Sequence, residues 1–130
     1  MIKVGLIGVG KIAKTFHLPA WAQLDKARVL ALVDPRIDEA RQVGREFGIT
    51  NVFRTMEDML DVVKLDAVDI CSPHMFHADH ACKALEAGLH CIIEKPFATD
   101  KTAGSILICS GVAILIASNV SVVINCSKFS

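Results

Sequence analysis

A short apolar run at the start of the chain ends in a glycine turn. The run is Ile2 to Ile7, and the sequence Gly8-Val9-Gly10-Lys11-Ile12-Ala13 follows it. Helical periodicity begins at about Lys11 and is interrupted by Pro19. A buried strand that feeds into a helix returns through a right-handed crossover to a parallel neighbour. This junction therefore predicts a parallel α/β sheet.

The same alternation of apolar runs and amphipathic segments continues through the first hundred residues. Further strands are predicted at 29–33, 51–53, 67–71 and 90–93, and helices at 38–47, from the N-cap Thr55 onward, and at 77–85. Strands that alternate with helices of about ten residues predict a doubly wound parallel sheet, the Rossmann type of α/β fold, with helices on both faces.

Composition narrows the class of protein further. A length of 130 residues fits one domain, and 52% apolar against 22% charged residues excludes a disordered tail. Fourteen basic residues balance fourteen acidic ones, which argues against a nucleic-acid partner bound through bulk basic charge. Five cysteines without a C-x-x-C pair indicate neither a disulfide framework nor a zinc knuckle. We see no signal-peptide pattern, and we expect a cytoplasmic protein.

Residues 102–130 are unusually apolar. No charged residue lies between Thr102 and Ser127, and the length of residues 102–118 and 120–125 predicts the last helix and strand of the domain. Nine β-branched residues between Ile106 and Ile124 favour strand over helix. Three explanations stay open: a helix and strand covered by a further domain or a partner subunit, a substituted or out-of-frame segment, or a membrane anchor, which the interrupting polar residues disfavour.

The glycine turn has the pattern G-x-G-x-x-A, in the context of a strand before it and a helix after it. In such a turn the first glycine allows the tight bend, and the second lets the backbone approach a pyrophosphate. The amides at the helix N-terminus then bind the phosphates. A plain tight turn is the alternative, but the context favours a dinucleotide site.

An acidic residue, Asp34, ends the second predicted strand, 21 positions beyond Ala13. Its carboxylate suits the ribose hydroxyls of NAD and would repel a 2′-phosphate. It could instead be the N-cap of the following helix. Arg36 could meet a 2′-phosphate, so we expect NAD and keep NADP open.

Two polar clusters follow the fourth and fifth strands, where ligands of open parallel sheets gather. The first contains Ser72, Pro73 and His77, and the second is Glu94-Lys95-Pro96. Lys95 could place a cation against the cofactor or a substrate hydroxyl, or help to move a proton. A solvated Glu94–Lys95 pair is the alternative. The H-x2-H-x2-H spacing of His74, His77 and His80 spreads the rings around a helix, so we expect no metal site and treat His80 as a surface residue.

These residues together resemble the N-terminal domain of the glucose–fructose oxidoreductase / inositol dehydrogenase / rhizopine catabolism (Gfo/Idh/MocA) family of NAD(P)-dependent oxidoreductases. The resemblance covers roughly residues 1–100. Its most specific part is the E-K-P triplet after A-G-L-H; the other matching stretches are VGLIGVGKIA, HLPA, VDP and DICSP.

The resemblance implies roles for individual residues. Gly8, Gly10, Lys11 and Ile12 would line the pyrophosphate, and Asp34 would hold the adenosine ribose. Ser72, Pro73 and His77 would lie along the cofactor toward the nicotinamide. Lys95 would contact the nicotinamide ribose and the substrate, with Glu94 beside it.

The resemblance also implies an activity, the oxidation or reduction of a hydroxyl or carbonyl of a sugar, cyclitol or similar polyol. The resemblance implies a protein of two domains. The second domain would supply substrate contacts and usually the homo-oligomer interface. Residues 1–130 correspond only to the NAD(P)-binding domain, so we expect this chain alone to bind cofactor without turning over a sugar. A non-catalytic dinucleotide sensor and a sheet that binds a sugar nucleotide or S-adenosyl group are the alternatives.

Overall fold

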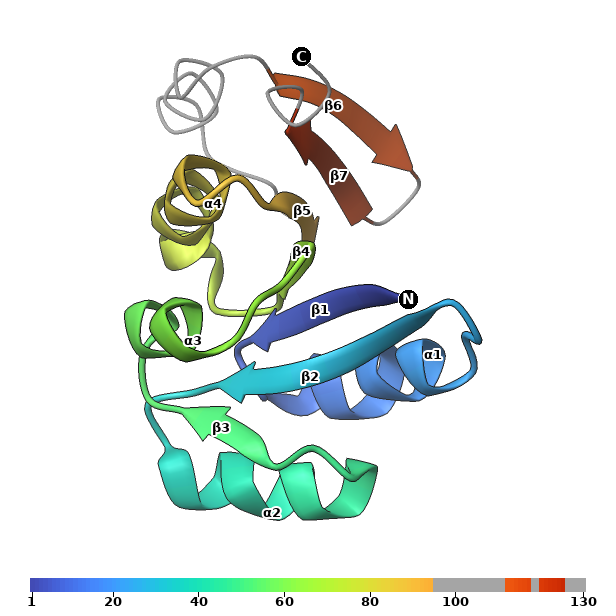
Figure 1. Cartoon of the computed structure of the whole chain (residues 1–130), viewed down its shortest axis with the longest axis vertical. Coiled ribbons are helices and arrows are strands. Elements are labelled where there is room, and N and C mark those ends of the chain that lie inside the picture. Colours follow the sequence, from blue (N-terminus) through green and yellow to red (C-terminus); the bar gives the residue numbers. More distant parts are fainter. Residues whose placement is uncertain (95–111, 118–119, 126–130) are drawn as a thin grey trace.

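The computed structural model describes residues 1–94, 112–117 and 120–125. Seven strands form one sheet in the order β3-β2-β1-β4-β5-β7-β6 (Figure 1). The strands are β1 (Ile2–Ile7), β2 (Ala27–Val33), β3 (Asn51–Phe53), β4 (Ala67–Ile70), β5 (His90–Glu94), β6 (Val112–Ala117) and β7 (Val120–Asn125). The first five pair in parallel, so the predicted Rossmann-type sheet is confirmed.

Helices cover both faces of the parallel part of the sheet, as predicted. They are the π-helical segment η1 (Ala13–His17), α1 (Leu18–Ala22), α2 (Ile37–Phe47), α3 (Met56–Val62), the 3-10 turn η2 (His74–Phe76) and α4 (His77–Glu86). One buried cluster joins η1, α1 and α2 to side chains such as Leu6 and Leu32, and a second joins α3 and α4 to Ile7 and Ile70. Adjacent residues Leu6 and Ile7 therefore face opposite layers, as the pleat of a strand requires.

Local signals explain where the helices begin and end. Thr55 caps α3, because its hydroxyl oxygen accepts the amide of Asp58 at 3.2 Å. Gly48 ends α2 in the left-handed conformation, with φ of 71°. The helical stretch from Lys11 continues through Pro19, which the sequence had suggested would interrupt it. The wider π turn of η1 ends at His17, two residues before Pro19. In a regular α-helix the proline ring would clash with the preceding turn.

The end of the sheet departs from the prediction. The expected helix over 102–118 is wrong at residues 112–117, which form β6, whereas 102–111 lie outside the described residues. The strand at 120–125 is confirmed as β7, but it pairs antiparallel with β5 and β6, so the sheet is not parallel throughout. Dense β-branched residues explain why this uncharged segment forms a hairpin. No helix in the described part of the chain combines the length and apolar character needed to cross a bilayer.

Candidate functional site

Gly8 holds the junction between β1 and the loop after β4. Its φ is +88°, a conformation that L side chains rarely adopt. A Cβ added there would lie 2.6 Å from the backbone nitrogen of Ser72 and 2.7 Å from its Cα. The Gly8 amide also donates to the carbonyl of Val33 at the end of β2, at 2.8 Å. Only glycine therefore allows the ends of these three strands to meet at this distance.

Gly10 has a different environment from Gly8. Apart from Gly10 itself and its two chain neighbours, no atom of the described residues lies within 4 Å of the position that its Cβ would take. Its carbonyl accepts the amide of Lys14 at 3.1 Å, in the first turn of the helix. The first amides of a helix have no acceptor within the helix. The open space beside Gly10, next to the amides of Lys11 and Ile12, is therefore suited to an anionic group.

Asp34 connects the glycine turn to the end of β2. The residue is 6% exposed; Oδ2 of its carboxylate accepts the amide of Val9 at 2.9 Å, and Oδ1 accepts the amide of Arg36 at 2.9 Å. The N-cap of α2 is Arg36, without a side-chain cap, so Asp34 closes a turn before the helix rather than capping it. A carboxylate has about four acceptor positions. Asp34 can therefore still accept hydroxyl donors from a ligand.

The Arg36 guanidinium is held by carboxylates. Its Nε lies 3.4 Å from Oδ1 of Asp34, and its Nη1 lies 3.1 Å from Oε2 of Glu39. To bind a 2′-phosphate with two parallel hydrogen bonds, the Arg36 guanidinium would have to break its contacts with Asp34 and Glu39.

A cleft of about 480 Å³ opens at the carboxyl ends of β1, β2 and β4. Of the predicted site residues, it brings together Gly8, Asp34, Arg36, Ser72 and Pro73. The sequence analysis did not identify the rest of its lining: Ile7, Val33, Pro35, Arg54, Thr55, Met56, Glu57, Phe76 and His80. Gly10, Lys11, Ile12 and His77 do not line this cleft.

The two histidines of α4 have different places around Ser72. His77 is 2% exposed, and its Nε2 donates to the carbonyl of Ser72 at 2.6 Å. It therefore supports the loop after β4 from the protein interior. His80 faces the cleft, and its Nδ1 lies 2.8 Å from Oγ of Ser72. Burial lowers the pKa of His80 below its ordinary value of 6.5. The contact of His77 with cofactor stays a prediction, and the interpretation of His80 as a plain surface residue is wrong.

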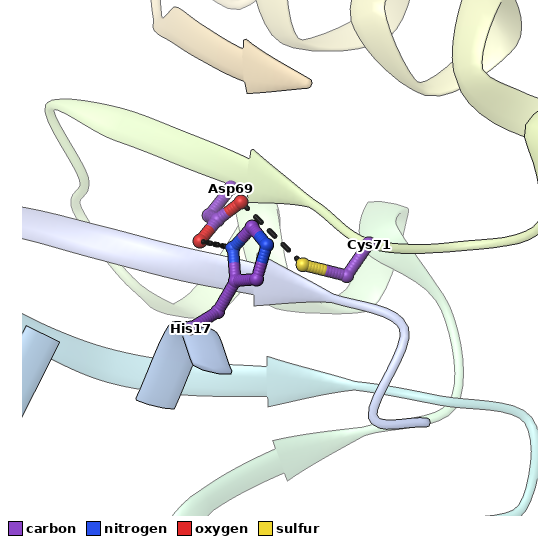
Figure 2. Close-up of side chains that lie close together, drawn as sticks. All are labelled: His17, Asp69 and Cys71. Atoms are coloured by element: carbon purple, nitrogen blue, oxygen red, sulfur yellow. Dashed lines mark hydrogen bonds and ion pairs between the residues drawn. The ribbon is translucent and has the colours of Figure 1, made fainter. Parts of the chain in front are cut away.

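A buried carboxylate anchors the helix of the glycine turn to the sheet. Asp69 of β4 is 1% exposed, and its Oδ2 accepts Nε1 of Trp21 at 2.7 Å and lies 2.7 Å from Nδ1 of His17. The Cys71 thiol lies 3.5 Å from Oδ1, and Figure 2 shows the side chains of His17 and Cys71 both directed toward the carboxylate. These bonds hold η1 and α1 against β4. The sequence analysis missed this role of Asp69, although an acidic residue inside an apolar strand was the available signal.

Metal-ligand side chains gather in the described residues only at His17, Asp69 and Cys71, whose ligand atoms lie within 4.8 Å of one another. His74, His77 and His80 form no such group, and the latter two have separate partners on Ser72. The His17–Asp69 contact of 2.7 Å is within hydrogen-bond distance. The absence of a metal site stays a prediction.

The second predicted cluster lies mostly beyond the described part of the chain. Glu94 ends β5, where its backbone pairs with Val120 of β7. Lys95 falls outside the described residues. Its predicted contact with the nicotinamide ribose and the substrate therefore stays a prediction.

Residues 2–108 match the Gfo/Idh/MocA family model, described as an oxidoreductase family with an NAD-binding Rossmann fold. The chain belongs to this family. It is 35% identical to D-glucoside 3-dehydrogenase of Escherichia coli over 95 residues, which are 73% of this chain and 27% of that protein. It is 38% identical to D-apiose dehydrogenase of Paraburkholderia graminis over 96 residues, which are 74% of this chain and 25% of that protein.

Solved structures of the family agree with the fold. A scyllo-inositol dehydrogenase from Lactobacillus casei, solved with NAD(H) and scyllo-inositol, has a TM-score of 0.77 and 31% identity, over 84% of this chain and 32% of that one. A 3-ketoreductase from Actinomadura kijaniata, solved with TDP-benzene and NADP, has a TM-score of 0.76 and 33% identity, over 83% and 34%. This Gfo/Idh/MocA chain thus spans about a quarter to a third of the length of these relatives.

Proposed function

We propose that this chain is the cofactor-binding part of an NAD(P)-dependent oxidoreductase that acts on a hydroxyl or carbonyl of a sugar, cyclitol or similar polyol. The observation that carries the proposal is the cleft beside the glycine turn, with the carboxylate of Asp34 inside it. Relatives named as glucoside, apiose and inositol dehydrogenases support the substrate class. A cytoplasmic location and a homo-oligomeric whole enzyme belong to the same proposal.

The diphosphate of the cofactor would lie at the open side of Gly10, against the first amides of the helix. The adenosine ribose would then donate its hydroxyls to Asp34. The cofactor when bound supplies the hydride acceptor or donor. The residues described here bind and orient it.

NAD is the proposed physiological cofactor, with NADP as the weaker ligand. A 2′-phosphate would lie near Asp34, whose nearly buried carboxylate already binds two backbone amides. The Arg36 guanidinium, which could compensate the phosphate charge, is paired with Asp34 and Glu39. We expect Asp34→Ser to reduce the difference between the binding affinities for NAD and NADP, because it removes the charge that repels the 2′-phosphate.

Binding of NADH to the folded chain tests the proposal. Calorimetric titration should give a micromolar-to-millimolar dissociation constant for the natural sequence. Gly10→Val should abolish binding while the circular dichroism spectrum is retained, because its side chain enters open space that the diphosphate would need. A folded chain that binds neither NAD(H) nor NADP(H) would contradict the proposal.

Lys95 is proposed to act beside the reacting carbon, with Glu94 next to it. The test belongs in a full-length enzyme that carries this domain and a substrate domain. Lys95→Ala should lower kcat strongly and leave NADH affinity within a few fold. Unchanged polyol oxidation by that variant would remove Lys95 from the catalytic machinery.

A further inference from the structure

Three side chains of metal-binding type converge between η1 and the end of β4. They are His17 of η1, Asp69 of β4 and Cys71, which directly follows Ile70, the last residue of that strand. One ligand atom of each lies within 4.8 Å of those of the other two. Figure 2 shows His17 and Cys71 directed toward the carboxylate of Asp69. The cluster lies outside the cleft, since none of the three is among the described residues that line it.

The anchoring role of Asp69 explains two of its neighbours but not Cys71. One carboxylate oxygen, Oδ2, accepts Nε1 of Trp21 and contacts Nδ1 of His17, both at 2.7 Å. The other oxygen, Oδ1, lies 3.5 Å from the Cys71 thiol. A thiol is a weak hydrogen-bond donor, so it adds little to the anchor. Its position is one that a further metal ligand would take.

The separations between the atoms fit the ligand shell of a zinc ion. Zinc in proteins is tetrahedral, and its nitrogen, oxygen and sulfur ligands lie about 2.0–2.3 Å away, which puts neighbouring ligand atoms about 3.3–3.6 Å apart. The 3.5 Å between Sγ of Cys71 and Oδ1 of Asp69 lies in this range. The His17 nitrogen would exchange its contact with Oδ2 for the metal. Trp21 would keep its hydrogen bond to Oδ2 and so orient the carboxylate.

The chemistry of the donor atoms selects the metal. Mg²⁺ and Ca²⁺ prefer oxygen ligands, whereas thiolate and imidazole both suit Zn²⁺. Three protein ligands leave the fourth tetrahedral position to water. Asp69 is 1% exposed, and a nearly buried carboxylate is stabilised by a positive charge beside it. We propose that His17, Asp69 and Cys71 bind one Zn²⁺, which joins η1 to β4.

This zinc site runs against the sequence-based expectation of no metal site. That expectation weighed the histidines at the start of α4, whose rings spread around the helix. His17 is far from Asp69 and Cys71 in sequence, and the packing of η1 on β4 brings the three together. Zinc binding would release to solvent the thiol proton of Cys71 and the proton between His17 and Asp69. The site does not depend on the proposed function.

Metal titration of the full 130-residue chain tests the site. Calorimetry with Zn²⁺ should give one ion per chain and a dissociation constant on the order of micromolar or below. Co²⁺ as a coloured substitute for zinc should add a sulfur-to-cobalt charge-transfer band, which reports ligation by a thiolate. Cys71→Ser and His17→Gln should each weaken Zn²⁺ binding by more than about tenfold, the low end for residues that only support metal ligands. Cys71→Ser should also remove the cobalt band.

Matched controls change the same residue types away from the cluster. Cys82→Ser removes another half-buried thiol, and His74→Gln changes an exposed histidine; both should bind Zn²⁺ as the natural chain does. Zn²⁺ should raise the urea midpoint of the natural chain and of both controls, but not that of Cys71→Ser. Should His17→Gln fail to fold, as judged by circular dichroism, Asp69→Asn replaces it, because its amide has nearly the same shape and is a poor zinc ligand.

The outcomes decide between a zinc site and a hydrogen-bonded anchor alone. Saturation of the natural chain by one Zn²⁺ that the folded cluster variants lose and the controls keep supports the site. Binding only at millimolar Zn²⁺ overturns it. A cobalt band that persists in Cys71→Ser also overturns it, because the metal is then held by other thiols. An equal loss of Zn²⁺ binding in Cys82→Ser has the same consequence.

Discussion

At the scale of single residues, the two glycines of the turn serve different purposes that their shared motif does not reveal. Gly8 is needed by the fold, because its backbone conformation and its contact with Ser72 leave no room for a side chain. Gly10 is open toward the described part of the chain, and in the proposed function its small size leaves room for the diphosphate. The motif predicts both glycines, but only the structure shows that a side chain would clash at Gly8 and would enter open space at Gly10.

We expect Gly8→Ala to lower the free energy of unfolding by at least about 2 kcal/mol, since left-handed backbone costs an L residue roughly 1–2 kcal/mol before any clash. Urea denaturation measures this. Gly10→Ala is the control and should stay within about 1 kcal/mol of the natural chain. Equal losses for the two variants would contradict the distinction.

The lowered pKa of His80 predicts a pH dependence of stability. The unfolded chain takes up a proton as the pH falls through about 6.5, whereas the folded chain resists protonation until lower pH. Folding stability contributed by this residue is therefore present above about pH 6.5 and decreases as the pH falls toward the folded-state pKa. Urea midpoints at about pH 7.5 and about pH 5.5 should differ less in His80→Gln than in the natural chain. An unchanged difference would contradict the assigned burial, and exposed His74→Gln is the control.

At the scale of elements, the helix that carries the glycine turn depends on one residue of a neighbouring strand. Asp69 binds His17 and Trp21, which lie in η1 and α1. The helix therefore cannot shift along β4 without breaking these bonds. A residue of the sheet thus fixes the position of the helix whose first amides are proposed to bind the diphosphate.

Asp69→Ala should cost about 2–4 kcal/mol of folding stability, because it leaves two half-buried nitrogens without their carboxylate. The single tryptophan, Trp21, reports the change directly through its fluorescence during urea unfolding. Asp61→Ala, at an exposed position of α3, should change stability by less than about 0.5 kcal/mol. A loss for Asp69→Ala no larger than that of the control would show that the carboxylate is not an anchor.

Sequence reasoning predicted the elements whose patterns are set locally. The five parallel strands are short apolar runs, and α2 and α3 carry caps at Gly48 and Thr55. It misjudged residues 112–117, because an uncharged segment lacks the polar face that separates helix from strand. It overlooked His80 because spacing along a helix does not tell which face meets the cleft. That information comes from packing between α4 and the loop at Ser72.

At the scale of the whole molecule, the parallel sheet brings the ends of β1, β2 and β4 to one edge, and the cleft forms where they meet. Asp34 and Ser72 are far apart in sequence yet line the same cavity. The family relationship covers this part of the relatives and about a quarter to a third of their length. The match to the NAD-binding family model therefore falls on the part of the chain that forms this cleft.

A crystal structure of the chain grown with NADH tests the central claim most directly. The account predicts the diphosphate against the amides that follow Gly10, with both adenosine ribose hydroxyls within hydrogen-bond distance of the Asp34 carboxylate. A dinucleotide bound at another edge of the sheet, or an adenosine ribose turned away from Asp34, would contradict it.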